Sequence, residues 1–167
     1  GCGRANIISY LQKRYKFYKK PIGLDVVENK KIKKNIIFIK KDAIKHLSSK
    51  SNNFDLILIK QTIHFFKKKD INKLLHLAKK NLNSRGKIVI LYLKSNTNEF
   101  PYFKKMKIEL NKSLQKDKLF VKIIKKNFSK YEQDNFKFKV SISRKTYIRM
   151  VNERFISCLL NFSKKEI

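Results

Sequence analysis

Short apolar runs alternate with helical patterns through the first 93 residues. Four of the runs have the length and apolar content of buried strands, at 22–26, 36–39, 55–59 and 87–93. Apolar residues recur at helical spacing at 6–16, 43–47 and 70–81. Such alternation favours parallel strands joined by right-handed helical crossovers. The sequence therefore predicts an α/β fold with a doubly wound, mainly parallel sheet and helices on both faces.

The remaining part of the chain, from residue 96, has a different pattern. Residues 102–115 predict a helix that begins after Pro101, and residues 146–162 predict a final amphipathic helix. Between them, the alternation Phe-Lys-Phe-Lys-Val-Ser-Ile at 136–142 predicts a half-exposed strand. We therefore predict a core at 1–95 and a mostly helical cap segment at 96–167 that belongs to the same domain.

The charge of the chain is strongly positive. Its 42 Lys and Arg against 12 Asp and Glu give a formal net charge of +30, which is typical of proteins that bind nucleic acid. Most of the cations are lysines, however, and they are spread over nearly every segment, as an AT-rich genome alone would produce. A selected polyanion-binding surface and compositional bias both stay open. In either case we expect non-specific attraction of polyanions such as RNA, weakened by salt.

Three classes of protein are disfavoured by what the sequence lacks. No apolar run approaches the roughly 18–20 residues that cross a bilayer, so we expect no membrane association. Cys2 and Cys158 lie too far apart in sequence for a metal-binding or redox motif, and we expect no metal site. Without a disulfide pattern, a reducing, cytoplasmic setting is the simplest interpretation.

A loop of small residues at the N-terminus is the first candidate site. In Gly1-Cys2-Gly3-Arg4-Ala5-Asn6, the small residues at 1, 3 and 5 stand directly before a predicted helix. They allow a ligand to approach the backbone closely and leave the helix N-terminal N–H groups available to it. A tight turn that binds nothing needs the same residues, so the loop alone does not decide between the two.

Aspartates at the ends of the predicted strands strengthen the ligand interpretation. Asp25 ends the first strand, roughly 20 residues after the loop, where nucleoside-binding sheets hold ribose hydroxyls. Asp42 follows the second strand at the same edge of the sheet, although it also has the position of an N-cap for the next helix. Asp55 begins the third strand and is expected to lie far from the site.

Five segments occur in an informative order. They are Gly-Cys-Gly-Arg-Ala at 1–5, Gly-Leu-Asp at 23–25, Ile-Phe-Ile-Lys-Lys-Asp-Ala at 37–43, Phe-Asp-Leu-Ile-Leu-Ile-Lys-Gln-Thr-Ile-His at 54–64 and Leu-Asn-Ser-Arg-Gly-Lys-Ile-Val-Ile at 82–90. In this order the chain resembles the class I S-adenosylmethionine-dependent methyltransferases over residues 1–93. The resemblance implies a Rossmann-like fold, methyltransferase activity and S-adenosyl-L-methionine as the cofactor.

The resemblance also implies roles for individual residues. The N-terminal loop would lie under the methionine part of the cofactor, Asp25 would hold the ribose, and the residues after the second strand would meet the adenine. Lys60 and Gln61, after the third strand, would line the methyl-transfer pocket, and Gly86 would turn the chain into the fourth strand. The cofactor-binding residues implied in this way are Gly1, Gly3, Ala5, Asp25, Val26, Asp42, Ala43 and Lys60.

The methyl acceptor is less constrained by the sequence. His64 is the one candidate for a catalytic base, which is needed only if the acceptor must lose a proton, and it also has the position of a packing histidine. The candidate acceptor-binding residues are Gln61, His64, Arg149 and Arg154, of which the two arginines suit an acidic small molecule. We expect a small-molecule acceptor, with RNA methylation and a non-catalytic basic binding module as the alternatives.

Two parts that the resemblance implies are absent from the sequence. The strand that should precede Gly1, normally central in the sheet, is missing together with its acidic residue. No closing antiparallel hairpin is visible before Ile167. We therefore predict that the chain is truncated at both ends.

Overall fold

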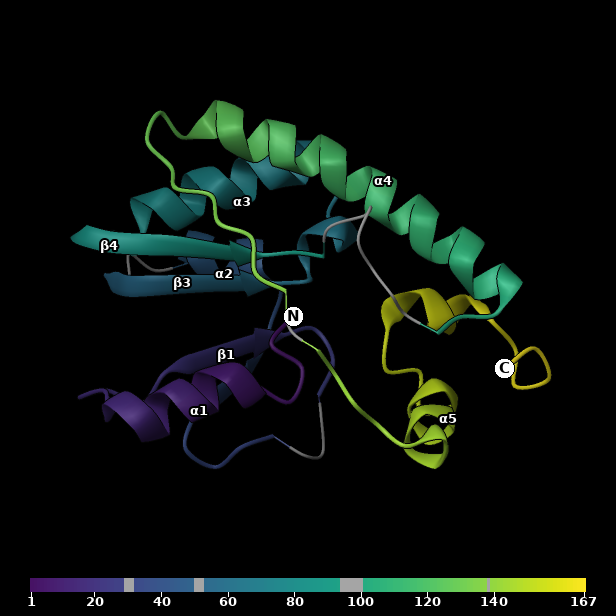
Figure 1. Ribbon diagram of the computed structural model, residues 1–167. Coiled ribbons are helices and arrows are strands. Elements are labelled where there is room, and N and C mark those ends of the chain that lie inside the picture. Colours follow the sequence, from purple (N-terminus) through teal and green to yellow (C-terminus); the bar gives the residue numbers. More distant parts are fainter. Residues whose placement is uncertain (29–31, 50–52, 94–100, 138) are drawn as a thin grey trace.

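The computed structural model describes residues 1–28, 32–49, 53–93, 101–137 and 139–167 (Figure 1). The helices are α1 (Asn6–Tyr15), α2 (Ala43–Ser49), α3 (Lys68–Lys80), α4 (Lys104–Asn127) and α5 (Arg144–Asn152), with 3-10 turns η1 (Ile63–Phe65) and η2 (Ser157–Asn161). The strands are β1 (Ile22–Asp25), β2 (Ile37–Lys40), β3 (Phe54–Lys60) and β4 (Leu82–Leu91). The predicted alternation of helices and strands is confirmed.

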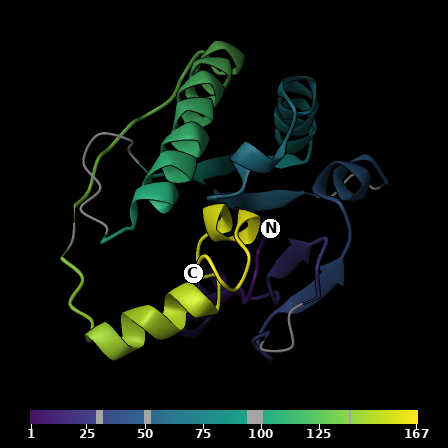
Figure 2. The same cartoon turned by 90° about the vertical axis from the view of Figure 1, so that its right-hand side faces the viewer.

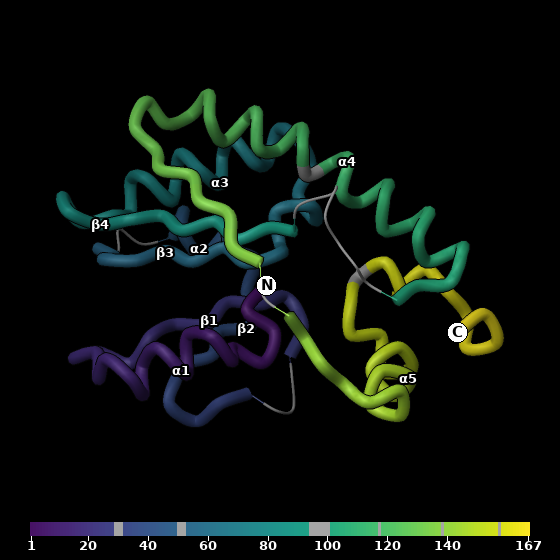
Figure 3. Tube along the Cα trace, viewed as in Figure 1, coloured from purple at the N-terminus to yellow at the C-terminus, as the bar shows by residue number. Residues whose placement is uncertain are grey.

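The four strands form two parallel pairs. β1 pairs with β2, from Ile22 opposite Ile37 to Asp25 opposite Lys40, and β3 pairs with β4. The parallel strands and their helical connections confirm the α/β fold class. Within the described residues no hydrogen-bonded ladder joins the two pairs, so the sheet consists of two small parts. α1 lies beside the β1–β2 part (Figure 3).

The turn predicted before the fourth strand lies inside β4 as a bulge. Phe54 pairs with Leu82, but Leu56 pairs with Lys87, so extra residues of β4 bulge out between these two pairs. A Cβ at Gly86 would come within 2.6 Å of the Phe54 carbonyl oxygen. Glycine is therefore needed here because two backbones approach each other closely.

Three helices cover one face of the β3–β4 pair. A first cluster joins Leu47 of α2 and Leu74 of α3 to strand residues such as Ile88. A second cluster joins α3 to α4 through Ile71 and Phe120. The helices that follow the strands are thus fixed by apolar packing on this face, which leaves the carboxyl ends of the strands to the connecting loops.

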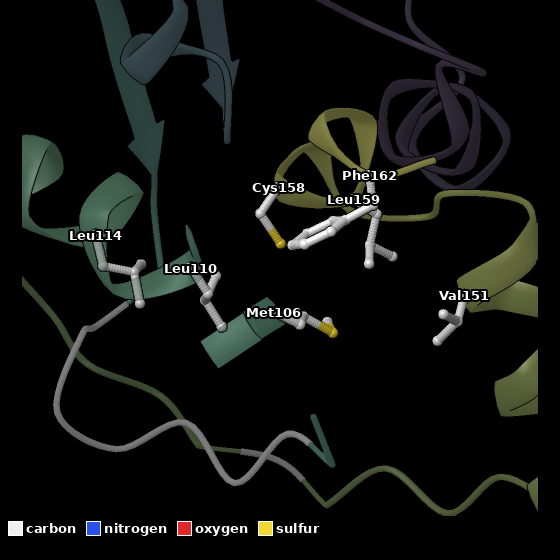
Figure 4. Packing of buried hydrophobic residues seen from close by; sticks show 7 residues of the cluster. All are labelled: Met106, Leu110, Leu114, Val151, Cys158, Leu159 and Phe162. Carbon is white, nitrogen blue, oxygen red and sulfur yellow. The ribbon is translucent and has the colours of Figure 1, made fainter. Parts of the chain in front are cut away.

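The C-terminal part of the chain packs against the first half of α4 (Figure 4). Met106, Leu110 and Leu114 of α4 belong to one cluster with residues of α5 and η2, among which Leu159 is fully buried. The second half of α4 packs on α3 through Phe120. α4 is therefore longer than the helix predicted at 102–115, and it links the two clusters.

The single helix predicted at 146–162 is wrong, because α5 ends earlier. Arg154 adopts a left-handed backbone with φ 53°. Its N–H donates to the carbonyl of Val151 at 2.9 Å, and the N–H of Phe155 donates to the carbonyl of Met150 at 3.0 Å. These two bonds form a Schellman cap, which ends the helix. Glycine normally takes this position, so an arginine there did not indicate in the sequence that the helix ends.

The strand predicted at 136–142 is also wrong for the described residues of that stretch, since they form no ladder; position 138 lies outside them. The side chains of Phe136 and Val140 are 71% and 67% exposed. An alternating pattern produces a strand only where a neighbouring strand supplies hydrogen bonds and an apolar face to cover. Here the chain is extended without such a neighbour.

Candidate cofactor site

The N-terminal loop has the backbone that a close-approaching ligand requires. Gly3 and Ala5 both have positive φ, 53° and 55°, and Ala5 is buried. The N–H of Ala5 donates to the carbonyl of Cys2 at 2.8 Å, which closes the turn before α1. No side chain caps the N-terminus of α1. The N-cap residue Ala5 therefore offers no side-chain acceptor to the N–H groups of the first turn.

The loop lies against the carboxyl end of β1. The N–H of Cys2 donates to the carbonyl of Leu24 at 2.8 Å. The Asp25 carboxylate accepts the N–H of Gly3 through Oδ2 at 2.8 Å and the N–H of Val27 through Oδ1 at 3.1 Å. Asp25 lies at the end of the strand, as predicted. It also holds the loop through Gly3, and the sequence did not indicate this contact.

The loop also meets the carboxyl end of β3, through a residue that sequence reasoning missed. Thr62 Oγ1 donates to the carbonyl of Lys60 at 2.8 Å and lies 3.3 Å from the carbonyl of Gly1. A Cβ at Gly1 would lie 2.7 Å from Thr62 Cγ2, so the two residues are in close contact. Only the position of Thr62 directly after the strand could have indicated this role.

Two predicted site residues next to Thr62 lie at the same edge. Lys60 Nζ donates to Gln61 Oε1 at 2.8 Å, and Gln61 has a positive φ of 48°. A non-glycine residue with this backbone is uncommon, and such residues concentrate at functional sites. The loop, Asp25, Lys60 and Gln61 are therefore brought to one place by the ends of β1 and β3.

Asp42, predicted to lie beside the adenine, caps α2. Its Oδ1 accepts the N–H of Lys45 at 3.0 Å, so the N-cap interpretation is confirmed. Its strand β2 is the partner of β1, and the N–H of Lys41 donates to the carbonyl of Asp25 at 2.9 Å. Asp42 and the following Ala43 therefore lie beside the end of β1, where Val26 is exposed.

Of the two arginines predicted to bind the acceptor, Arg149 lies on α5 and Arg154 lies just after it. Arg154 donates from its guanidinium to the carbonyls of Leu160 at 3.3 Å and Phe162 at 2.7 Å, and so it fixes the segment around η2. Arg149 is exposed on α5. No contact of the described residues joins either arginine to the N-terminal loop.

His64 lies in η1, on the side that faces α4. Its ring packs against Phe65 with the ring centroids 4.3 Å apart. Burial lowers the pKa of His64 from its ordinary 6.5, and the positive charge of Lys116 lowers it further. The imidazole is therefore neutral at pH 7 and has a lone pair that can accept a proton.

Cys2 is unsuited to nucleophilic chemistry, because burial and the charge of Asp25 raise the pKa of its thiol.

The segment that contains the loop and these strand ends matches a known family. The model of the methyltransferase domain matches residues 1–90. The chain belongs to the methyltransferase domain family. The class inferred from the sequence is thereby confirmed: this is a class I S-adenosylmethionine-dependent methyltransferase, with S-adenosylmethionine as its cofactor.

The fold of this methyltransferase is similar to that of a solved structure. A SAM-dependent methyltransferase from Archaeoglobus fulgidus matches with a TM-score of 0.52 and 20% sequence identity, over 92% of this chain and 74% of that chain. This likeness supports the Rossmann-like fold. No curated protein matches the chain.

The loop of the methyltransferase fits its cofactor on three observations. α1 begins without a side-chain cap. A Cβ at Gly3 would have no atom within 4 Å, so the backbone is open to a ligand on that side. The Asp25 carboxylate accepts two N–H groups but has about four acceptor positions, which leaves capacity for ribose hydroxyls.

Two kinds of feature were not found in the described part of the chain. Its residues contain no group of three or more His, Cys, Asp or Glu arranged to hold a metal ion. None of its helices has both the length and the apolar composition needed to cross a bilayer.

The lowered pKa of His64 predicts a pH dependence of stability. The imidazole of His64 binds a proton less tightly in the folded protein than in the unfolded chain. The contribution of the neutral His64 to stability is therefore present above pH 6.5 and is lost as the pH falls below that value. A His64→Gln variant, which cannot titrate, should show a shallower loss of the free energy of unfolding between about pH 7.5 and 5.5 in urea titrations. His76→Gln, which removes an exposed imidazole of α3, is the control and should keep the native slope. Equal slopes for His64→Gln and the native protein would contradict the prediction.

Proposed function

We propose that this methyltransferase transfers the methyl group of S-adenosylmethionine to a small-molecule acceptor. In this proposal the loop of Gly1, Gly3 and Ala5 holds the methionine part, and Asp25 holds the ribose. Asp42, Ala43 and Val26 lie beside the adenine, and Lys60 and Gln61 border the reacting methyl group. The observation that carries the proposal is the bond from Gly3 N–H to Asp25, which ties the loop to the end of β1.

Positioning is the main contribution of the protein to such a reaction. The bound cofactor supplies a methyl group activated by its sulfonium. Alignment of an acceptor with that group can contribute roughly 7–11 kcal/mol to lowering the barrier. Asp25 and the loop fix the cofactor side, and the positive φ of Gln61 fixes the backbone on the acceptor side. For an acceptor that must lose a proton, neutral His64 is the base that we propose.

The C-terminal cluster supports a small acceptor. Leu93, two residues after β4, packs against the cluster formed by α4, α5 and η2. This cluster therefore begins beyond the carboxyl end of β4, at the same edge as the ends of β1 and β3. Apolar helices beyond that edge leave less room for a folded polymer, which favours a small molecule as the acceptor.

RNA as the acceptor is the second candidate. It is favoured by one observation, a basic hollow between α3 and α4 whose described lining contains lysines and no carboxylate. The hollow lies on the helical layer, and the methyl-transfer site lies at the strand ends, so an RNA bound there would have to extend around α4. For this reason we place the small-molecule acceptor first.

Transfer of a labelled methyl group from S-adenosylmethionine tests the proposal. The methyltransferase is incubated with the labelled cofactor and, separately, with the small-molecule and the RNA fractions of a cell extract. We expect label in the small-molecule fraction and S-adenosylhomocysteine in equal amount. Label in the RNA fraction alone would replace the proposed acceptor with the second candidate. Absence of both label and S-adenosylhomocysteine would contradict the proposed reaction.

A further inference from the structure

A hollow of about 510 Å³ lies between α3 and α4, on the outer side of the helical layer. Figure 2 shows the two helices side by side above the strands. Its polar lining consists of Lys68 and Asn72 from α3 and Lys122, Lys126 and Asn127 from α4. All three lysines are exposed, and no described side chain that lines the hollow is an Asp or Glu. The described lining is therefore positively charged.

A second hollow on α4 continues the first one. Leu119 lines both, and the second adds Lys112 and Lys116. Residues 112, 116, 119, 122 and 126 are spaced by three or four positions, so they share one face of the helix. At a rise of 1.5 Å per residue this face is about 21 Å long. We call the two hollows together the α3–α4 trough.

Among the described side chains, Glu109 is the carboxylate that lines the trough, and it is already paired. Glu109 lies 2.6 Å from Lys112, and a hydrogen bond from Lys112 lowers the pKa of Glu109, to which the charge of Lys116 adds a smaller contribution. Lys122, Lys126 and Lys68 have no carboxylate partner among the described side chains that line the trough. A line of like charges along one groove attracts a polyanion more strongly than the same charges dispersed over the surface.

An amide pair fixes the wall of the trough. Asn127 Nδ2 donates to Asn72 Oδ1 at 3.0 Å and to the carbonyl of Ile123 at 2.8 Å. These bonds use neither the Asn72 amide nitrogen nor Oδ1 of Asn127. One donor and one acceptor therefore stand beside the lysines, which is what a ribose 2′-hydroxyl requires, since it both donates and accepts.

An exposed aromatic ring follows the C-terminal end of α4. Lys125 Nζ lies 5.3 Å from the centre of the Tyr131 ring, which is 54% exposed, whereas Phe128 packs against the cluster that contains Ile71. Grooves that bind single-stranded nucleic acid combine lysines along the phosphates with rings on which bases stack. An extended chain of phosphates fits a row of lysines along a hollow better than a flat anionic membrane does, because the hollow recedes from a plane.

We propose that the α3–α4 trough binds single-stranded RNA, with Lys68, Lys122 and Lys126 on the phosphates. The inference goes beyond the proposed function, because RNA bound here need not be the methyl acceptor. Binding of this kind would attach the enzyme to RNA whichever molecule it methylates.

Fluorescence anisotropy with a labelled oligouridine tests the proposal on the whole chain. We compare the native protein with a triple variant, Lys68→Gln, Lys122→Gln and Lys126→Gln. The matched control is Lys13→Gln, Lys34→Gln and Lys145→Gln, which removes the same charge from exposed lysines elsewhere. We expect the trough variant to lose about tenfold or more in affinity at low salt, and its salt slope to fall by about two. The control should lose less than about threefold.

The other outcomes decide against the proposal. Equal losses in the two triple variants would show that the charge acts diffusely, and oligothymidine bound as tightly as oligouridine would overturn the choice of RNA. If the trough variant loses binding to anionic lipid vesicles but retains RNA binding, a membrane surface is the partner.

Binding of S-adenosylhomocysteine, measured in parallel, should be unchanged in both variants. It checks folding and separates failure here from failure of the proposed function. If the triple variant does not fold, Lys122→Gln alone should still weaken RNA binding about twofold to threefold, and an unchanged affinity would overturn the proposal.

Discussion

Replacing Asp25 with alanine is expected to weaken the binding of S-adenosylhomocysteine by about 100-fold. The carboxylate accepts N–H groups from Gly3 and Val27, and in the proposed function it also holds the ribose. Hydrogen bonds to a charged group contribute about 1.5–3 kcal/mol each. In the proposed function the Asp25 carboxylate accepts two hydroxyl groups of the ribose. Loss of these two bonds to the ligand amounts to about 3 kcal/mol or more, which corresponds to about 100-fold in affinity. Isothermal titration calorimetry of native and variant proteins measures the difference.

Asp55→Ala is the matched control for this experiment. It removes the same charge from the same type of residue, but Asp55 lies at the start of β3, where its carboxylate accepts from the side chain of Asn83. We expect the control to bind S-adenosylhomocysteine as the native protein does. If Asp55→Ala lost as much affinity as Asp25→Ala, net charge rather than the position of Asp25 would be responsible. Native affinity in Asp25→Ala would exclude Asp25 from the cofactor site.

The order of elements in the core could be predicted because local pattern determines it. The apolar runs at 22–26 and 55–59 contain β1 and most of β3, and the helical spacing at 6–16 and 70–81 corresponds to α1 and α3. These patterns depend on residues that are close in sequence. How strands pair depends on residues far apart, and for this reason the division into two hydrogen-bonded pairs was not predicted.

The C-terminal part could be predicted less well, for two identifiable reasons. The alternation at 136–142 has the period of a strand, but the described residues there have no neighbouring strand, and period alone does not supply one. The apolar spacing at 146–162 continues across the end of α5, so the break at Arg154 was hidden. That break depends on a left-handed arginine, and nothing in a pattern of apolar residues indicates one.

The candidate site was predictable where it depends on strand ends. The loop and Asp25 lie together because the loop opens the first helix and Asp25 ends β1, and both positions follow from element boundaries. The contact of Thr62 with Gly1 joins residues 61 positions apart and involves a short polar side chain of no special type. Arg154 had the chemistry of a carboxylate ligand, but its guanidinium is used by the carbonyls of Leu160 and Phe162.

Truncation of Leu159 to alanine is expected to lower the free energy of unfolding by about 2–5 kcal/mol. Leu159 is fully buried in the cluster that joins α4, α5 and η2. Because a folded domain is stable by only about 5–15 kcal/mol, a loss of this size should reduce the melting temperature strongly.

Leu160→Ala provides the control, because this neighbouring leucine is 58% exposed and its loss should change stability by no more than about 0.5 kcal/mol. Equal losses in the two variants would contradict the burial of Leu159. Since α4 packs on the C-terminal cluster with its first half and on α3 with its second, we expect one unfolding transition in circular dichroism and loss of S-adenosylhomocysteine binding within it. Two transitions, with cofactor binding lost only in the later one, would instead show that residues 96–167 unfold separately and do not belong to the same domain as the core.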